Sequence, residues 1–180
     1  LQSALQLIDR ALEIDASNPR AHYYRGSVVA SIGRLDEALK SFDRAIYLDP
    51  DNEVFYKDRA ITRYEGGLLL PALADYTRVI DFAPHDFTAL NNIGIVFTDL
   101  QSFDDAVDFF DRAIDLNASY VEAFHNRGNA LYLAERKEEA LASFDSGLVI
   151  DSRFEPSLQK RGELLVEFQR PNEAISALSA

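Results

Sequence analysis

Cysteine, methionine and tryptophan are all absent from this chain of 180 residues. Without cysteine the chain forms neither a disulfide bond nor a thiolate metal site. Long apolar runs are absent as well, so the sequence offers no candidate for a membrane-spanning helix, and we expect no membrane partner. The complete lack of methionine leads us to expect a fragment of a longer protein.

Basic residues are fewer than acidic residues. Lysine and arginine number 18 against 30 aspartate and glutamate residues, which gives a net charge of −12. A surface of this sign repels phosphate backbones, so we expect no nucleic-acid partner. Hydrophobic residues make up 47% of the chain and charged residues 27%, a composition typical of a folded protein with a core.

One internal repeat of 34 residues organises the sequence. An alanine recurs at this interval at Ala4, Ala38, Ala72, Ala106, Ala140 and Ala174. A bulky residue recurs at Ile8, Phe42, Tyr76, Phe110, Phe144 and Leu178. A small residue recurs at Gly26, Ala60, Gly94, Gly128 and Gly162. No insertion disturbs the spacing, so the repeats extend along the whole chain.

Each repeat has room for two helices. Asn18-Pro19 is a typical helix start, and this first helix is expected to run to about Ile32 and to end at Gly33. The segment LDEALKSFDRAIYL that follows has apolar residues at the i, i+3, i+4, i+7 spacing of an amphipathic second helix. Asn52 is expected to cap the first helix of the next repeat.

Glycine and proline inside these predicted helices have structural explanations. The recurring glycines are expected to face the recurring alanines of the partner helix, which lets the two backbones approach closely, and Phe42 or Phe110 is expected to fill the space beside them. Pro71 and Pro171 fall in the first turn of a second helix, where proline is tolerated. Gly66-Gly67 is expected to form a helix-ending turn.

The period, the small residue in the first helix, the alanine and aromatic residue in the second, and the closing Pro50 and Pro84 resemble the tetratricopeptide repeat family over the whole chain. The resemblance implies an all-α, right-handed superhelical solenoid of antiparallel helix hairpins, whose first helices line a concave groove. Pentatricopeptide repeats are about one residue longer and bind RNA, which the acidic charge opposes. Sel1-type repeats are usually longer and less uniform.

The resemblance divides residues 1–180, a single array, into one truncated repeat, four full repeats and one partial repeat. The predicted ranges are 1–16 for a lone second helix, then 17–50, 51–84, 85–118 and 119–152, and finally 153–180. Such arrays need polar ends, and neither end here has one. End-to-end self-association through the truncated repeats is therefore an alternative to binding another protein.

An arginine precedes four of the small residues of the first helices. These arginines are Arg25, Arg59, Arg127 and Arg161. The position is more often leucine in the family. We expect the stem of each arginine to pack while its charge reaches an acidic residue of the aspartate-rich second helices.

The family binds extended peptides or helices of partner proteins in the concave groove, which leads us to examine its residues. The candidate peptide-binding residues are Tyr24, Lys57, Asp58, Asn91, Asn92, His125, Asn126, Asn129, Tyr132 and Lys160. Other residues expected along the groove include Ser27, Ser31, Ile61 and Glu65.

Asn92 and Asn126 are one period apart and are expected to line up along the groove. An asparagine amide can pair with both the N–H and the C=O of a peptide bond. The pair is partly similar to the asparagine ladder in the repeat domains of O-linked N-acetylglucosamine transferases. Solvent exposure without a ligand, or a bond to a neighbouring repeat, are the alternatives for these two side chains.

The charges of the groove limit the partner. The groove is expected to be polar and weakly acidic, because most of the net charge lies on second helices, so we expect a neutral to mildly basic peptide. The two-carboxylate clamp that holds chaperone C-terminal tails is not expected. Glu122 and Asn126 stand where the clamp needs lysine and arginine, and Glu122 would repel a carboxylate.

No set of residues forms a catalytic site. Glu122 and His125 have the Glu-x-x-His spacing of carboxylate-bridged metal sites, but the further ligands that such sites need are missing from the sequence. No phosphate-binding glycine loop occurs. We therefore expect no enzyme, no metal and no cofactor. The predicted function is a protein–protein interaction scaffold, and the alternative is a substrate-recruiting domain of a larger enzyme such as a glycosyltransferase.

Overall fold

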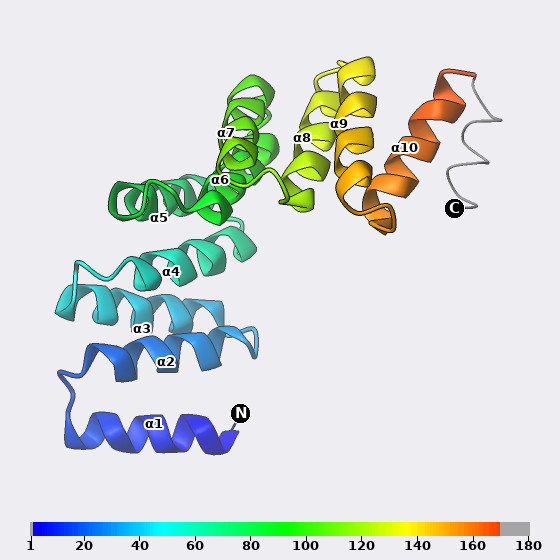
Figure 1. Ribbon diagram of the computed structural model, residues 1–180. Helices are drawn as coiled ribbons and strands as arrows, with labels where there is room; N and C mark the ends of the chain where they lie inside the picture. Colours follow the sequence, from blue (N-terminus) through cyan, green and yellow to red (C-terminus); the bar gives the residue numbers. More distant parts are fainter. Residues whose placement is uncertain (1, 170–180) are drawn as a thin grey trace. The chain divides into compact units, whose positions relative to one another are not determined.

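The computed structural model describes residues 2–169 and is helical throughout (Figure 1). Its helices are α1 (Gln2–Ile14), α2 (Pro19–Ala30), α3 (Leu35–Leu48), α4 (Glu53–Glu65), α5 (Leu69–Phe82), α6 (Phe87–Asp99), α7 (Phe103–Leu116), α8 (Val121–Leu133), α9 (Lys137–Ile150) and α10 (Glu155–Glu167). The fold is an all-α helical solenoid. Each full repeat predicted from the sequence encloses one pair of these helices. No described helix is both long enough and apolar enough to cross a membrane.

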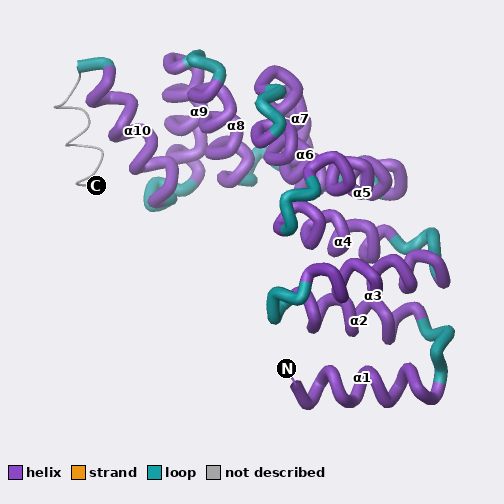
Figure 2. Tube along the Cα trace, turned by 180° about the vertical axis from the view of Figure 1, so that it is seen from behind, coloured by secondary structure: helices purple, strands orange, loops and turns teal. Residues whose placement is uncertain are grey.

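The chain divides into two compact units, Leu1–Ala89 and Leu90–Ala180. In the first unit, consecutive helices from α1 to α5 pack against one another, so that each helix contacts the next in the chain (Figure 2). The same holds for α7 to α10 in the second unit. The even-numbered helices are the first helices of the predicted repeats, and the odd-numbered helices are the second helices.

The helix ends follow local chemistry that the sequence only partly predicted. Asn18 caps α2, because its side-chain oxygen accepts a hydrogen bond of 3.1 Å from the backbone N–H of Ala21. Asn52 precedes α4 but forms no such cap. Its amide instead donates to Asp49 at 3.2 Å, so the expected cap at Asn52 is wrong. The bond to Asp49 holds the side chain through its amide nitrogen, and the side-chain oxygen accepts no hydrogen bond from the backbone of α4.

The loop between the two helices of a hairpin contains one residue with a left-handed backbone. Gly33 and Gly67 adopt it with φ of 78° and 73°. At the same position of later hairpins stand Gln101, Glu135 and Gln169, with φ between 57° and 61°. The predicted helix-ending turns at Gly33 and Gly67 are confirmed, and Pro71 lies in the first turn of α5 as expected. Pro171, Ala174 and Leu178 lie outside the described residues.

A phenylalanine ring covers the glycine of the first helix in three hairpins. A Cβ atom added to Gly26 would lie 2.8 Å from Phe42, one on Gly94 would lie 2.6 Å from Phe110, and one on Gly128 would lie 2.5 Å from Phe144. All three distances are shorter than carbon atoms allow. The sequence assigned this role to the recurring alanines. Ala38, Ala72, Ala106 and Ala140 are fully buried, but the atoms nearest to the glycines are those of the phenylalanine rings.

All four arginines pair with an aspartate of a second helix, as expected, and three of them also bridge two successive second helices. Each guanidinium pairs with the aspartate sixteen residues earlier: Arg25 with Asp9 at 2.9 Å, Arg59 with Asp43 at 2.6 Å, Arg127 with Asp111 at 2.5 Å, and Arg161 with Asp145. Three of them also donate to the residue sixteen positions later, which is Ser41, Asp75 or Ser143. An arginine of the first helix thereby links the second helix of its own hairpin to the one before it.

Replacing Gly128 by alanine tests the close approach of the helices. Alanine ordinarily favours a helix by about 1 kcal/mol over glycine. Here we expect Gly128→Ala to lower the free energy of unfolding by about 1–3 kcal/mol, because the added methyl group overlaps the Phe144 ring. Urea denaturation measures the change. The cost should shrink in a Phe144→Leu background, and a stabilising Gly128→Ala in the wild-type background would contradict the contact.

Candidate functional site

All ten candidate residues lie on first helices. Tyr24 is on α2 and Lys160 on α10. Helix α4 carries Lys57 and Asp58, and α6 carries Asn91 and Asn92. The remaining four, on α8, are His125, Asn126, Asn129 and Tyr132. The two units contain separate groups of these residues, which are described in turn.

In the first unit, Asp58 and Lys57 have different partners. The Tyr23 hydroxyl donates to Asp58 at 2.9 Å and connects α2 to α4. Burial and the Asp58 carboxylate both raise the pKa of Tyr23, so the phenol keeps its proton and remains the donor. Tyr24 packs beside the Tyr23 ring and is 55% exposed.

The side chain of Lys57 on α4 reaches the start of α6. Its ammonium donates to Asp86 at 2.8 Å and to Thr88 at 2.7 Å. Burial opposes ionisation of Asp86, but the hydrogen bonds from Lys57 and Thr88 outweigh it and lower the pKa of this carboxyl group. Asp86 also caps α6 by accepting from the backbone of Ala89 at 2.9 Å. The charge of Lys57 is therefore neutralised within the protein.

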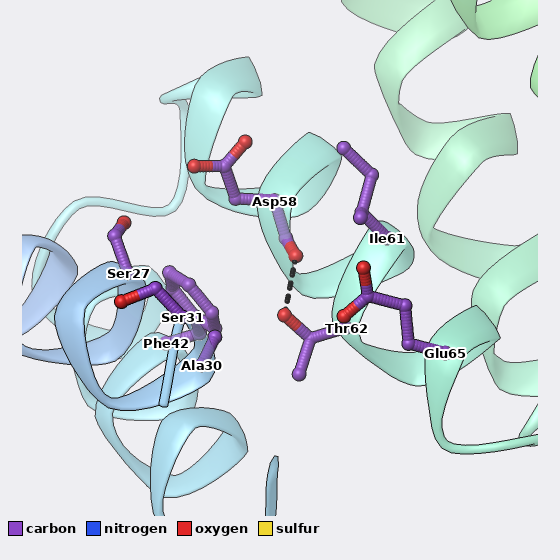
Figure 3. Close-up of a pocket in the computed structure, with 8 residues that line it drawn as sticks. All are labelled: Ser27, Ala30, Ser31, Phe42, Asp58, Ile61, Thr62 and Glu65. Atoms are coloured by element: carbon purple, nitrogen blue, oxygen red, sulfur yellow. Dashed lines mark hydrogen bonds between the residues drawn. The ribbon is translucent and has the colours of Figure 1, made fainter. Parts of the chain in front are cut away.

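A pocket of about 390 Å³ opens between α2 and α4 (Figure 3). The α2 side presents Ser27, Ala30 and Ser31, with Phe42 of α3 behind them. The α4 side presents Asp58, Ile61, Thr62 and Glu65. The sequence indicated most of these residues as part of the groove. It missed Ala30, Phe42 and Thr62, because all three belong to the hydrophobic or buried pattern of their helices.

In the second unit, the asparagines pair with each other across helices. The Asn126 amide donates to the side-chain oxygen of Asn91 at 3.0 Å. Asn91 is only 3% exposed, so this bond fixes Asn126 to the preceding first helix. The alternative of a bond to a neighbouring repeat therefore holds for Asn126, and its partner is Asn91 and not Asn92. Asn92 is half-buried, and its side chain makes no hydrogen bond with the described residues.

His125 is held between two helices by both of its ring nitrogens. Asn129 donates its amide N–H to Nε2 at 2.9 Å, which assigns the ring proton to Nδ1, and Nδ1 then donates to the fully buried Ser157 at 3.1 Å. Burial, followed by the nearby charge of Lys160, lowers the pKa of His125. Both nitrogens are occupied in this arrangement, so the imidazole has no lone pair left for a metal.

Exposed charged side chains surround Tyr132 of α8. The Tyr132 hydroxyl donates to Glu167 of α10 at 2.9 Å, and Lys137 pairs with the same carboxylate at 3.0 Å. Lys160 pairs with Glu163 at 2.9 Å and lies 6.0 Å from the centre of the Tyr132 ring. Exposed pairs of this kind contribute little to stability, so their side chains can rearrange around a ligand at low cost.

One spacing recurs in the bonds between first helices. The pairs Tyr23–Asp58, Asn91–Asn126 and Tyr132–Glu167 are each 35 residues apart. Alignment of side chains at the repeat period of 34 does not predict this offset. Two successive helices meet through residues one position out of step, because the helices are shifted and rotated relative to each other.

A tetratricopeptide repeat family model matches residues 1–53 and 58–121. No curated protein matches the chain. Similar solved structures include a tetratricopeptide repeat protein from Parabacteroides merdae, with 22% identity, a TM-score of 0.85, and coverage of 98% of this chain and 70% of that one. A structure of MamA has 19% identity, a TM-score of 0.77, and coverage of 86% and 90%.

A third similar structure is YrrB, described as a tetratricopeptide repeat protein with an unusual peptide-binding site. It has 19% identity and a TM-score of 0.74, and covers 98% of this chain and 91% of its own. At these identities the three structures show that the fold is shared. The family match and the fold together support a protein-interaction scaffold.

The environment of His125 predicts a dependence of stability on pH. Because folding lowers the pKa of His125, the unfolded chain takes up a proton first as the pH falls below about 6.5. The stability that neutral His125 contributes is therefore complete at pH 8 and decreases as the pH falls toward the lowered folded pKa. The advantage of wild type over His125→Gln in urea denaturation should be smaller at pH 5.5 than at pH 8.

The same substitution at His85, an exposed residue in the loop before α6, controls for the loss of an imidazole. An equal advantage of the wild-type protein over His125→Gln at both pH values would show that His125 is not held neutral.

Proposed function

Because the chain belongs to the tetratricopeptide repeat family, we propose that it is a protein-interaction scaffold whose first helices bind an extended peptide segment of a partner. The proposal depends mainly on the hydrogen-bonding groups that the asparagine side chains of α6 and α8 leave unused. Asn126 uses one N–H to bond Asn91 and retains its second N–H and its carbonyl oxygen. Asn92 retains all of its hydrogen-bonding groups toward the solvent or a ligand.

The bond to Asn91 prepares Asn126 for a ligand. A side chain that is already held in one orientation loses less conformational freedom on binding, so more of the contact energy appears as affinity. The remaining donor and acceptor of the amide match one peptide bond. Recognition of this kind reads the backbone of an extended peptide and tolerates variation in its side chains, which suits a scaffold.

The charge and the relatives support the same function. The net charge of −12 favours a neutral to mildly basic peptide over an acidic one. YrrB, whose fold is similar, is described by its peptide-binding site, which supports peptide binding as a use of this fold. We propose no catalytic step, because both nitrogens of His125 serve hydrogen bonds within the protein.

Peptide selection followed by affinity measurement tests the proposal. Linear 12-residue peptides displayed on phage are selected on the wild-type protein, and the affinities of the enriched peptides are measured by fluorescence anisotropy. We expect Asn92→Ala/Asn126→Ala to bind these peptides roughly tenfold more weakly, because each lost hydrogen bond is worth about 0.5–1.5 kcal/mol.

Gln2→Ala/Gln6→Ala is the matched control, since it removes two exposed amides from α1, which is a second helix. This control should bind as the wild type does. The proposal fails if no peptide is enriched, or if the asparagine variant binds the enriched peptides as tightly as the control does.

A further inference from the structure

The pocket between α2 and α4 contains two carboxylates with no cationic partner. Asp58 accepts a hydrogen bond only from the neutral Tyr23 hydroxyl, and Glu65 forms no ion pair with any described residue. Four basic residues of α2 and α4 have partners outside the pocket: Arg25 pairs with Asp9, Lys57 with Asp86, and Arg59 and Arg63 with Asp75. The negative charge of the pocket is therefore left for a ligand.

The hydroxyl groups of the pocket have already used their protons. Ser27 donates to the backbone oxygen of Tyr23 at 3.2 Å, Ser31 to that of Val28 at 2.8 Å, and Thr62 to that of Asp58 at 2.9 Å. Figure 3 shows the last of these bonds inside the α4 helix. A hydroxyl whose proton is committed can only accept a further hydrogen bond. Every polar side chain that lines the pocket is consequently an acceptor.

Apolar side chains line the rest of the pocket. Ala30, Phe42 and Ile61 line the space between the two polar edges. An alkyl chain can lie against these side chains while its polar end reaches the acceptors. A ligand that is apolar along its stem, positively charged at its tip and rich in donors satisfies all three features together.

We propose that this pocket binds the side chain of an arginine or lysine of the partner peptide, with Asp58 and Glu65 holding the cationic group. The inference rests on the proposed function, because it assigns one side chain of the peptide to one place on the first helices. The five donors of a guanidinium, or the three of an ammonium, match a lining that offers only acceptors.

The second unit does not repeat this pocket. Positions equivalent to Ser31, Asp58 and Thr62, three periods later, hold Leu133, Lys160 and Leu164. The equivalent of Glu65 is Glu167, whose carboxylate is already paired with Lys137. The preference for a basic side chain therefore belongs to α2 and α4 and is not a general property of the repeat.

Peptide selection on three proteins tests the assignment. The pocket variant is Asp58→Asn/Glu65→Gln, and the control is Asp108→Asn/Asp115→Asn. The control removes two carboxylates with the same seven-residue spacing from the exposed face of α7. We expect peptides enriched on wild type and control to carry arginine or lysine at one fixed position, and peptides enriched on the pocket variant to lack this preference.

A double-mutant cycle of affinity measurements then tests whether the basic side chain of the peptide contacts the pocket. Replacing the fixed arginine by citrulline, or the fixed lysine by norleucine, should weaken binding to the wild type roughly tenfold, as expected for two partly exposed ion pairs. The same replacement should not weaken binding to the pocket variant. Glu65→Gln alone, which leaves the Tyr23–Asp58 bond intact, should show part of the loss and guards against a folding defect in the double variant.

The outcomes separate the two proposals. Enriched peptides without a fixed basic residue, or an unchanged basic preference on the pocket variant, overturn the pocket assignment and leave the scaffold function standing. If the wild type enriches no peptide, both proposals fail.

Discussion

The contact between the glycine of a first helix and an aromatic ring of the second helix sets the distance between the two helices of a hairpin. Gly26, Gly94 and Gly128 have no room for a side chain because Phe42, Phe110 and Phe144 lie against them. Interiors packed this closely change little under small forces. Each of these three hairpins therefore presents its first helix as a rigid support for the polar side chains along it.

The arginines extend this rigidity from one hairpin to the next. Arg25, Arg59 and Arg127 each contact two second helices and pair with an aspartate of the earlier one. These bonds connect successive second helices within each unit. On the first helices, neighbouring repeats are connected by more varied hydrogen bonds, such as Tyr23–Asp58 and Asn91–Asn126. The side chains that we propose for ligand binding lie on the first helices.

The period and the residue types of the sequence predicted the fold and the pairing of the arginines with acidic residues of the second helices. They could not predict which side chains meet between successive first helices, because a repeat length carries no information about how one helix is shifted against the next. Asn126 therefore bonds Asn91, where the sequence had suggested alignment with Asn92. The hydrogen bond of Asn52 could not be predicted either: Asn52 bonds Asp49 and does not cap α4. The hydroxyl protons of Ser27, Ser31 and Thr62 also became assignable only with the helices in place.

The central claim is that ligands bind to the first helices and not to the second helices. Hydrogen–deuterium exchange, with and without a saturating enriched peptide, tests it most directly, because protection maps the bound surface. The account predicts slower exchange in one or more of α2, α4, α6, α8 and α10, with α1, α3, α5, α7 and α9 unchanged. Protection confined to the odd-numbered helices would contradict it.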